Sequence, residues 1–297
     1  MRVMTSAPDI LCIGSVLWDV IGRAEIPMRK GSDMPGRITR LPGGVALNIG
    51  MAFARFGLKP ELLSAVGQDA EGDELILACK ARGLGSQYIY RSDDLPTDQY
   101  MAVEGSNGLI AAIADAHSLE AAGDKILRPL TDGTLPTPYS GTIALDGNLT
   151  LEVLNQIAIS PVFACADLRV APASPGKALR LRPFILARRG TLYVNLEEAG
   201  LLCQTSFATS DAAAKSLLER GASRVVVTNG ARAATVGSDQ GLLTQTPPPV
   251  VVTRITGAGD TLMAAHIAAE RRGMGPEPAL TEALAAAALY VSGETEI

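Results

Sequence analysis

The 297-residue sequence has few of the residue types from which several common catalytic centres are built. It contains only two histidines, His117 and His266, so neither a histidine-based metal centre nor a Ser-His-Asp triad is expected. Its four cysteines are scattered and form no C-x-x-C pair, which also argues against a zinc site. Because most of them lie in apolar surroundings, we expect free thiols in a reducing cytosol.

Long runs of one charge sign and long apolar runs are also missing. The net charge is −5 without a basic block, which does not suggest binding to a nucleic-acid backbone. No apolar run is long enough to span a bilayer, and residues 1–9 lack the apolar core of a signal peptide. We therefore expect a cytoplasmic protein with no nucleic-acid and no membrane partner.

What the sequence does contain is typical of helices packed on a parallel sheet. Hydrophobic residues make up 47% and aromatic residues 4%, with alanine and valine abundant. Apolar runs and helical patterns alternate through the second half, which argues for βαβ units and a mostly parallel sheet. The strands expected are Ile10 to Gly14, Thr142 to Asp146, Val162 to Ala166, Thr191 to Asn195 and Arg224 to Thr228.

Residues 88–114 have a different pattern. The short alternating runs Tyr88 to Tyr90, Gln99 to Glu104 and Leu109 to Ala114 are separated by turn residues and predict hairpin strands. Together with residues 20–41 they predict a small β-rich lid on the main sheet. Lids of this kind exclude water from a transferring phosphate.

A further motif is V-T-R-I-T-G-A-G-D-T-L, from Val252 to Leu262. It predicts the end of a strand formed by the apolar run Val250 to Val252, then a tight turn and the start of a helix. Gly257 and Gly259 permit close backbone approach to a ligand, and the free N–H groups of the helix start form an anion site. Asp260 could take a proton from a hydroxyl that attacks a phosphate bound there. The alternative is an ordinary turn followed by a first-turn acid that favours the helix dipole.

A second glycine motif lies in L-P-G-G-V-A-L-N-I-G-M-A-F-A-R-F-G, Leu41 to Gly57, which predicts a helix. Gly43 and Gly44 allow a tight entry into it. The amide of Asn48 could bind a pair of sugar hydroxyls, or it could satisfy backbone groups near the helix end. Asp19 follows the first strand at the sheet edge where ligands bind, although an Asp that stabilises a turn fits equally well.

The pairing of G-G-V-A-L-N with T-G-A-G-D resembles the PfkB, or ribokinase-like, family of carbohydrate and nucleoside kinases, and the resemblance covers essentially the whole chain. It implies an α/β fold, with one ribokinase-like kinase domain over residues 1–297 and a lid formed by about 20–41 and 88–114. It also implies ATP and Mg²⁺ as cofactors. The sequence has no Walker-type G-K-[ST], but this family uses the G-A-G turn instead.

By position, the resemblance implies that Asp260 is the catalytic base. The residues that it implies for the anion hole are Gly257, Ala258 and Gly259, and those for sugar binding are Asp19, Gly43, Gly44 and Asn48.

The resemblance also implies a nucleotide site. Asn195 and Glu198, in N-L-E-E, match the family's N-x-x-E, which helps to hold Mg²⁺ on the phosphates through water. The alternative for Glu198 is a helix-start acid that favours the dipole. Thr228 and Gly230 match the start of the T-x-G-x-x-G segment beside the nucleotide. Ala233 replaces its second glycine, which puts close backbone approach there in doubt.

Within the family, the sequence looks most like pseudouridine kinases. The stretches that carry this likeness are P-G-G-V-A-x-N, L-P-T-D-Q-Y-M-A-V, A-A-I-A-D-A and L-D-G-N-L. Leu47 and Ala116 depart from that pattern, where Arg and Met are common. The expected acceptor is thus a ribosyl compound, pseudouridine first, with Asp115, Thr97 or Tyr100 as candidates to border its base. A ribose or other nucleoside kinase is the alternative, and a non-catalytic nucleotide-binding relative is a third. The lid is a candidate homodimer contact, as in many relatives.

Arg254 departs from the wider family, in which many members have an Asp here that helps to bind a monovalent cation. Its guanidinium stays protonated and could supply that positive charge if it folds back under the loop. The alternative is that Arg254 points to solvent and the cation site is lost. Under either interpretation we expect that no monovalent cation is required.

Overall fold

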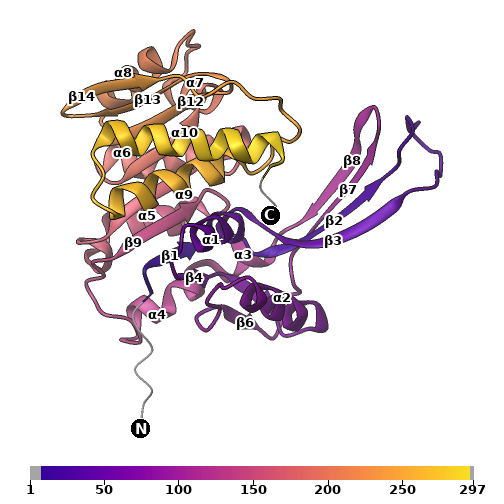
Figure 1. Cartoon of the computed structure of the whole chain (residues 1–297). Coiled ribbons are helices and arrows are strands. Elements are labelled where there is room, and N and C mark those ends of the chain that lie inside the picture. The colour runs from indigo at the N-terminus through magenta and orange to yellow at the C-terminus, as the bar shows by residue number, and fades with distance from the viewer. Residues whose placement is uncertain (1–7, 295–297) are drawn as a thin grey trace.

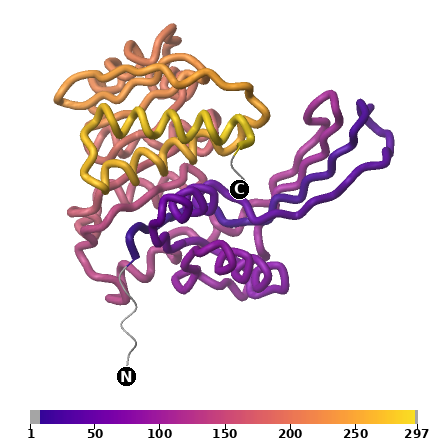
Figure 2. Tube along the Cα trace, in the orientation of Figure 1, coloured from indigo at the N-terminus to yellow at the C-terminus, as the bar shows by residue number. Residues whose placement is uncertain are grey.

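The computed structural model describes residues 8–294, and its body is an eight-stranded sheet covered by helices (Figures 1 and 2). The strand order is β14-β13-β12-β11-β10-β9-β1-β4. Neighbours from β4 to β12 are parallel, and β13 and β14 continue the sheet in antiparallel pairing. The strands are β1 (Ile10–Ile13), β4 (Pro60–Leu63), β9 (Thr142–Asp146), β10 (Asp167–Ala171), β11 (Thr191–Asn195), β12 (Arg224–Asn229), β13 (Arg232–Ser238) and β14 (Gly241–Gln245).

Helices cover both faces of this sheet, as expected for buried parallel strands. In β1, Ile10 and Cys12 pack into one apolar core, and Leu11 and Ile13 pack into the other. The helices are α1 (Val45–Arg55), α2 (Ala70–Ala81), α3 (Ser118–Ala122), α4 (Arg128–Thr131), α5 (Leu151–Ile159), α6 (Arg182–Leu186), α7 (Leu196–Cys203), α8 (Ser210–Glu219), α9 (Ala258–Arg271) and α10 (Pro276–Ser292). Short 3₁₀ turns span Gly123–Leu127, Pro161–Phe163 and Pro175–Leu181. The predicted mostly parallel α/β sheet is therefore confirmed.

A separate four-stranded sheet, the lid, projects from the body (Figure 1). Trp18 at its base donates its indole N–H to the carbonyl of Glu71 in α2 at 2.9 Å. The guanidinium of Arg40 stacks over the Trp18 ring at 3.9 Å from its centroid and pairs with Glu74 in α2 at 2.8 Å. The lid is thus anchored on α2. Its order is β3-β2-β7-β8, from β2 (Leu17–Arg23), β3 (Arg37–Gly43), β7 (Gln99–Gly105) and β8 (Gly108–Asp115).

Three local predictions were wrong. Val250 to Val252 is exposed and forms no strand, because β14 already ends at Gln245 and the prolines 247–249 cannot donate to a sheet. Val162 to Ala166 is not a strand, because its first residues belong to a 3₁₀ turn that begins at Pro161. The strand follows it as β10 (Asp167–Ala171). Tyr88 to Tyr90 does not enter the lid. Instead β6 (Tyr90–Ser92) pairs with β5 (Ala65–Gly67) in a two-stranded sheet.

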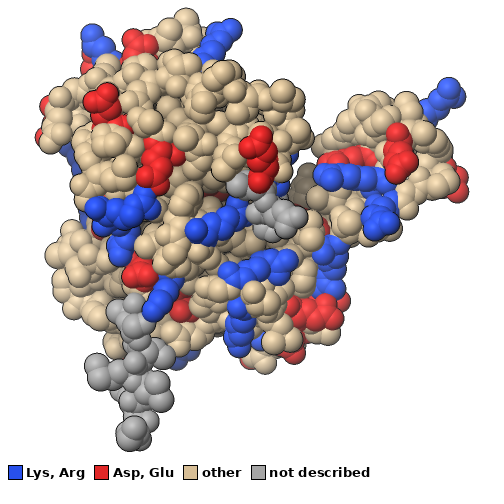
Figure 3. All heavy atoms as spheres, viewed as in Figure 1, with Lys and Arg blue, Asp and Glu red and all other residues tan. Residues whose placement is uncertain are grey.

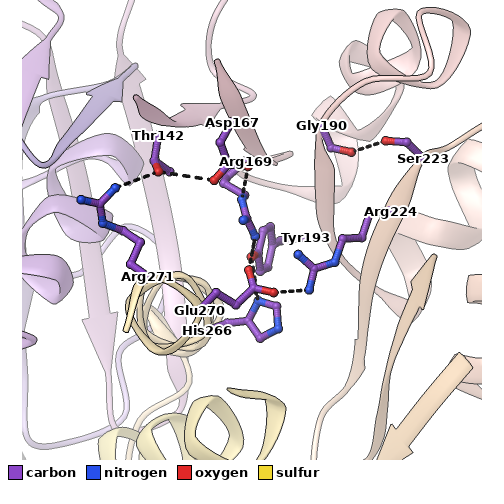
Figure 4. Close-up of polar contacts among 10 residues, drawn as sticks. All are labelled: Thr142, Asp167, Arg169, Gly190, Tyr193, Ser223, Arg224, His266, Glu270 and Arg271. Atoms are coloured by element: carbon purple, nitrogen blue, oxygen red, sulfur yellow. Dashed lines mark hydrogen bonds and ion pairs between the residues drawn. The ribbon is translucent and has the colours of Figure 1, made fainter. Parts of the chain in front are cut away.

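The C-terminal half of α9 is fixed to the sheet by a polar cluster around Glu270 (Figure 4). Glu270 accepts from Arg169 in β10 and from Arg224 in β12. Burial alone would raise the pKa of Glu270, but the hydrogen bond from Arg224 and the charge of Arg169 outweigh it and lower the pKa to about 2. Arg169 also donates to Tyr193 in β11, whose hydroxyl lies 2.9 Å from Nδ1 of His266 in α9. Three neighbouring strands thereby hold the helix at whose other end Asp260 lies.

The described surface carries charges of both signs in alternation on the face that Figure 3 shows. Within residues 8–294, no helix is both long and apolar enough to cross a membrane. The prediction about a signal peptide concerns residues 1–9, of which 1–7 lie outside the described part. Cys12, Cys79 and Cys203 are buried free thiols, whereas Cys165 is exposed.

Candidate active site

The acceptor half of the candidate site lies where the first turns of α1 and α9 meet. Asp260, in the first turn of α9, lies close enough to Asn48 in α1 for the Asn48 side chain to lower the pKa of its carboxyl. Gly257 precedes α9 with a φ of 87°, in the left-handed region that glycine adopts without strain. The glycine turn thus brings a helix N-terminus and a carboxylate to one place, although the N–H of Ala258 donates to the carbonyl of Ile255 at 3.1 Å and is not free.

The surroundings of Asp260 suit a proton acceptor at neutral pH. Burial raises the pKa of its carboxyl, the negative charge of Asp146 raises it further, and the hydrogen bond from Asn48 opposes the rise, which leaves a pKa of about 7. A general base is most effective when its pKa is near the working pH. Such a pKa is compatible with the role that the sequence predicts for Asp260, which stays a prediction.

Asp19 approaches the same region from the lid strand β2. A Cβ on Gly43 would lie 2.0 Å from Oδ2 of Asp19, so the carboxylate occupies the space that a side chain would fill. Gly44 has a φ of 97°, and a Cβ there would lie 2.4 Å from the carbonyl oxygen of Ser15. Both glycines are thus required by close approaches. Burial raises the pKa of Asp19 to about 6.

Asp146 and Ser15 also belong to this region. Asp146 lies in the L-D-G-N-L stretch, but the motifs assigned a site role to neither residue. Asp146 ends β9 and is completely buried. Its Oδ2 accepts from the backbone N–H of Ser15 at 2.8 Å and from the Ser15 hydroxyl at 2.5 Å, and its Oδ1 accepts from the N–H of Asn148 at 2.8 Å. The rule that selected Asp19, a polar residue just after a buried strand, would also have selected Asp146.

The pairing of the lid strands places Tyr100 and Asp115, two candidates to contact the nucleobase, on opposite faces of the lid. Tyr100 in β7 is the cross-strand partner of Asp19, whereas Asp115 in β8 is the partner of Gln99. Because neighbouring residues in a strand point to opposite faces, Asp115 does not share the face of Asp19, and a substrate contact by Asp115 stays a prediction. Thr97 donates its N–H and hydroxyl to the Asp that caps α2, which gives it a structural role.

The residues predicted to bind the nucleotide line a different part of the surface. A cleft with a volume of about 960 Å³ is lined by residues that include Asn195, Thr228 and Gly230. This volume lies in the range of small-molecule sites, roughly 300 to 1,000 Å³. The predicted nucleotide residues are therefore brought together around a cleft large enough for a nucleotide. Ala233 lies in β13, where its carbonyl accepts from the hydroxyl of Ser210 at 2.8 Å.

Asn195 and Glu198 form a reciprocal cap on α7. The Asn195 side chain accepts from the N–H of Glu198 at 2.9 Å, and Oε2 of Glu198 accepts from the N–H of Asn195 at 2.8 Å. Glu198 is buried, and burial raises the pKa of its carboxyl. Both residues therefore have a structural role, which leaves Oε1 of Glu198 as the atom that could accept from a metal-bound water.

Asn195 and Glu198 could help to hold Mg²⁺ only if the nucleotide phosphates and water supply most of its ligands. Among residues 8–294 there is no group of three or more His, Cys, Asp or Glu side chains able to hold a metal ion. Mg²⁺ usually keeps several waters and binds through one or two carboxylates together with substrate phosphates. Glu198 is the single carboxylate predicted for such an outer contact, but it is buried and is not among the residues that line the cleft.

Arg254 is partly buried against the end of α10 and does not point freely to solvent. Its guanidinium carbon lies 3.9 Å from the centroid of the Tyr290 ring, and its Nε donates to the Tyr290 carbonyl at 2.8 Å. The N-terminus of α9 and the C-terminus of α10 lie at the same end of the body, toward the lid (Figure 1). A fixed positive charge thus lies near the glycine turn.

Comparisons with known proteins agree with this geometry. The uncharacterized sugar kinase YeiI of Escherichia coli is 28% identical over 232 residues, which cover 76% of this chain and 62% of that relative. This chain therefore spans less than two thirds of the length of YeiI. The pseudouridine kinase of E. coli is 28% identical over 269 residues, which cover 86% of this chain and 81% of that relative.

Solved structures share the fold over nearly the whole chain. A putative sugar kinase from Clostridium perfringens superposes with a TM-score of 0.83 at 23% identity and covers 99% of this chain and 92% of its own. Arabidopsis thaliana ribokinase with ribose and ATP gives 0.78 at 21% identity, and a putative E. coli ribokinase II with ATP and Mg²⁺ gives 0.78 at 19%. Each covers 96% of this chain and 93% of its own. Since the family match itself extends over residues 7–295, this protein belongs to the pfkB family of carbohydrate kinases.

Proposed function

We propose that the protein is an ATP-dependent, Mg²⁺-requiring kinase that phosphorylates the primary 5′-hydroxyl of a ribosyl compound. The observation that carries the proposal is the place of Asp260, a carboxylate in the first turn of α9 directly after the glycine turn and beside Asn48 of α1. A base and a set of free helix amides at one point are what phosphoryl transfer to a hydroxyl requires.

In the proposed reaction, the Asp260 carboxylate takes the proton of the acceptor hydroxyl as that oxygen forms a bond to the γ-phosphorus of ATP. The bond from this phosphorus to the β-phosphate oxygen breaks, and ADP leaves. The amides of Gly257 and Gly259 would donate to the transferring phosphoryl oxygens, and that of Ala258 would join them only if it left its hydrogen bond to the Ile255 carbonyl. Bound Mg²⁺ would neutralise part of the phosphate charge. The products are the phosphate ester, ADP and the proton left on Asp260.

Asp19, Gly43, Gly44 and Asn48 would hold the sugar so that its primary hydroxyl faces Asp260. Asn195, Thr228 and Gly230 would hold the nucleotide, and Glu198 would contact hydrated Mg²⁺ through Oε1. Because Arg254 already provides a positive charge near the turn, we propose that no monovalent cation is required.

Pseudouridine is the proposed acceptor and pseudouridine 5′-phosphate the product. This choice is supported by the lid and glycine motifs and by the similarity to the E. coli pseudouridine kinase. Tyr100, next to Asp19 in the lid register, is the aromatic side chain proposed to border the base. A ribokinase or another sugar or nucleoside kinase is the second candidate, because Leu47 and Ala116 depart from the pseudouridine kinase pattern.

The test is ATP turnover by the purified protein with a panel of ribosyl acceptors. We expect pseudouridine to exceed free ribose in kcat/KM by a large factor, up to roughly 10⁴-fold, because a site that hydrogen-bonds a group rejects analogues that lack it. Equal or faster turnover of ribose or adenosine would favour the second candidate. No turnover with any acceptor would favour a non-catalytic relative.

We also propose that residues 1–297 act as one kinase domain in the cytoplasm. The lid is the proposed homodimer contact, because Ile38 and Ile113 on it are 77% and 67% exposed. Sedimentation of the purified protein tests this, and a monomer at micromolar concentration would contradict it.

A further inference from the structure

Tyr290, near the end of α10, lies directly against the glycine turn that precedes α9. Its hydroxyl donates to the carbonyl oxygen of Thr256 at 3.0 Å. A Cβ on Gly257 would lie 2.5 Å from the same hydroxyl oxygen, so the phenol fills the space that a larger residue would need. The side chain is 6% exposed. A buried phenol thus holds one specific peptide group of the turn.

That peptide group is the one that carries the N–H of Gly257. The peptide unit is planar and trans, so the Thr256 carbonyl and the Gly257 N–H point in opposite directions. When Tyr290 holds the carbonyl toward α10, the N–H must point away from α10. The bond therefore fixes the direction of the Gly257 amide, the first of the proposed anion-hole amides.

Arg254 fixes the position of Tyr290 through two contacts. Its guanidinium carbon lies 3.9 Å from the centroid of the ring, within the range of cation–π contacts, and its Nε donates to the backbone carbonyl of Tyr290 at 2.8 Å. The N–H of Thr253 donates to the Val291 carbonyl at 2.8 Å. The segment before the turn and the last turn of α10 are therefore joined by backbone and side-chain contacts.

The charged side chains near Tyr290 come from the segment before α9, from α1 and from α9 itself. Arg254 lies over the ring and Arg55 of α1 lies 5.9 Å from its centroid. Burial raises the pKa of the Tyr290 phenol, the two guanidiniums lower it, and Asp260 raises it. The phenol accordingly stays protonated at neutral pH and remains a donor to Thr256.

We propose that Tyr290, held by Arg254, is a positioning residue that aims the Gly257 amide at the transferring phosphoryl group. The inference rests on the proposed function, because it requires the turn to face a phosphate. Tyr290 touches neither substrate, and it acts only through the Thr256 to Gly257 peptide. Its effect should therefore be larger in the transition state than in the ground-state complexes.

Tyr290→Phe removes the hydroxyl and keeps the ring under Arg254. Loss of an oxyanion-hole donor costs about 10²- to 10³-fold in kcat, and a misdirected donor should cost less, so we expect a kcat loss of about 10- to 100-fold. The KM for ATP should change by less than about threefold, since ground-state binding is retained. Tyr88→Phe is the control, because Tyr88 lies beside Glu61, away from the turn, and should leave kcat unchanged.

A second measurement separates positioning from a loss of structure. The affinity for MgADP with aluminium fluoride and acceptor, an analogue of the transferring phosphoryl group, should fall in Tyr290→Phe by about the same factor as kcat. The affinity for MgADP alone should not fall. Equal losses of both affinities, or a kcat like that of the wild type, would overturn the inference.

Arg254 is tested through a double variant. If Arg254 acts through Tyr290, Arg254→Met should lower kcat in the wild-type background and have little further effect in Tyr290→Phe, whereas independent effects would multiply. Multiplying effects overturn the role given to Arg254. A wild-type protein without turnover on any acceptor would refute the proposed function and this inference together, whereas an active wild type with an unaffected Tyr290→Phe refutes this inference alone.

Discussion

Ser15 gives both its backbone N–H and its hydroxyl to one oxygen of Asp146, at 2.8 and 2.5 Å. The Ser15 hydroxyl also accepts the N–H of Val45 at 2.9 Å. One serine thus joins the chain after β1, the end of β9 and the start of α1. The charge of Asp146 helps to raise the pKa of Asp260, the proposed base. The hydrogen bonds from Ser15 therefore hold in place a charge that affects this pKa.

The first prediction is a pH profile controlled by Asp146. Asp260 must be ionised to accept a proton, so kcat/KM of the wild type should rise with pH and level off above about 7. Asp146→Asn removes the neighbouring charge and should move this rise to lower pH. The measurement is kcat/KM for the acceptor at saturating ATP from about pH 5 to about pH 9, a range that brackets the pKa of Asp260.

Ser15→Ala is the matched control, because it removes a hydrogen bond to Asp146 and leaves the charge in place. It should lower the free energy of unfolding by about 1 to 3 kcal/mol, because the N–H of Val45 loses its acceptor and Asp146 loses one donor, without moving the pH profile. An unchanged profile in Asp146→Asn would refute the electrostatic link.

Asp260→Asn should reduce kcat at least about a hundredfold, since general-base losses are roughly 10²- to 10⁴-fold, with little change in ATP affinity. Turnover near the wild-type value would refute the catalytic assignment. The variant should also change the pH dependence of stability. Because folding raises the pKa of Asp260 from 3.8 to about 7, the wild type loses stability as pH rises through this range. Thermal melts of Asp260→Asn should lack that loss.

The sequence predicted those features that depend on local pattern. The helix from Val45 and the turn at Gly257 follow from glycine and from apolar spacing, which act within a few residues. Both were placed within a residue or two of the structure. The family resemblance then supplied the roles of residues that lie far apart in sequence.

Features that depend on packing could not be predicted. The apolar run Val250 to Val252 looks like a strand, yet Val251 is 82% exposed because no partner strand is available beyond β14. Tyr290 has no recognisable motif, and its importance lies in a contact with Thr256 across 34 positions. Likewise, nothing in the local pattern near Asp115 shows which face of the lid it occupies, because register is set by pairing between strands.

The cluster at the far end of α9 leads to a stability prediction. Glu270 accepts from Arg169 and Arg224 in a largely buried setting, so Glu270→Gln removes the counter-charge of Arg224 and leaves Arg169 with Asp167 alone. We expect a loss of about 3 kcal/mol in the free energy of unfolding at pH 7. Because the folded pKa of Glu270 is lowered from 4.5 to about 2, the wild type should lose this contribution as pH falls between these values.

Denaturant unfolding of both proteins at pH 7 and pH 3 measures the effect. Glu282→Gln is the control, because Glu282 pairs with Arg272 at the surface and should matter by less than about 1 kcal/mol. Equal losses in the two variants would contradict the role of burial.

Activity should not depend on potassium. Arg254 stays protonated and lies against Tyr290 beside the turn, so a fixed cation is already present. In buffer that contains only bulky organic cations, the enzyme should be nearly fully active. Activation by about tenfold or more on addition of potassium chloride, without a similar effect of sodium chloride, would refute this prediction. Such a factor corresponds to about 1.4 kcal/mol of transition-state stabilisation.

The last prediction concerns the space that Gly43 leaves for Asp19. A Cβ at Gly43 would lie 2.0 Å from Oδ2 of Asp19, so Gly43→Ala must displace the carboxylate from the acceptor site. Loss of a hydrogen bond to a charged group costs about 1.5 to 3 kcal/mol, which corresponds to about a 10- to 100-fold rise in the acceptor KM. The KM for ATP should stay unchanged, because the nucleotide cleft does not include Gly43. Gly176→Ala is the matched control, since no atom lies within 4 Å of its added Cβ. If both variants keep the wild-type acceptor KM, Asp19 does not hold the sugar.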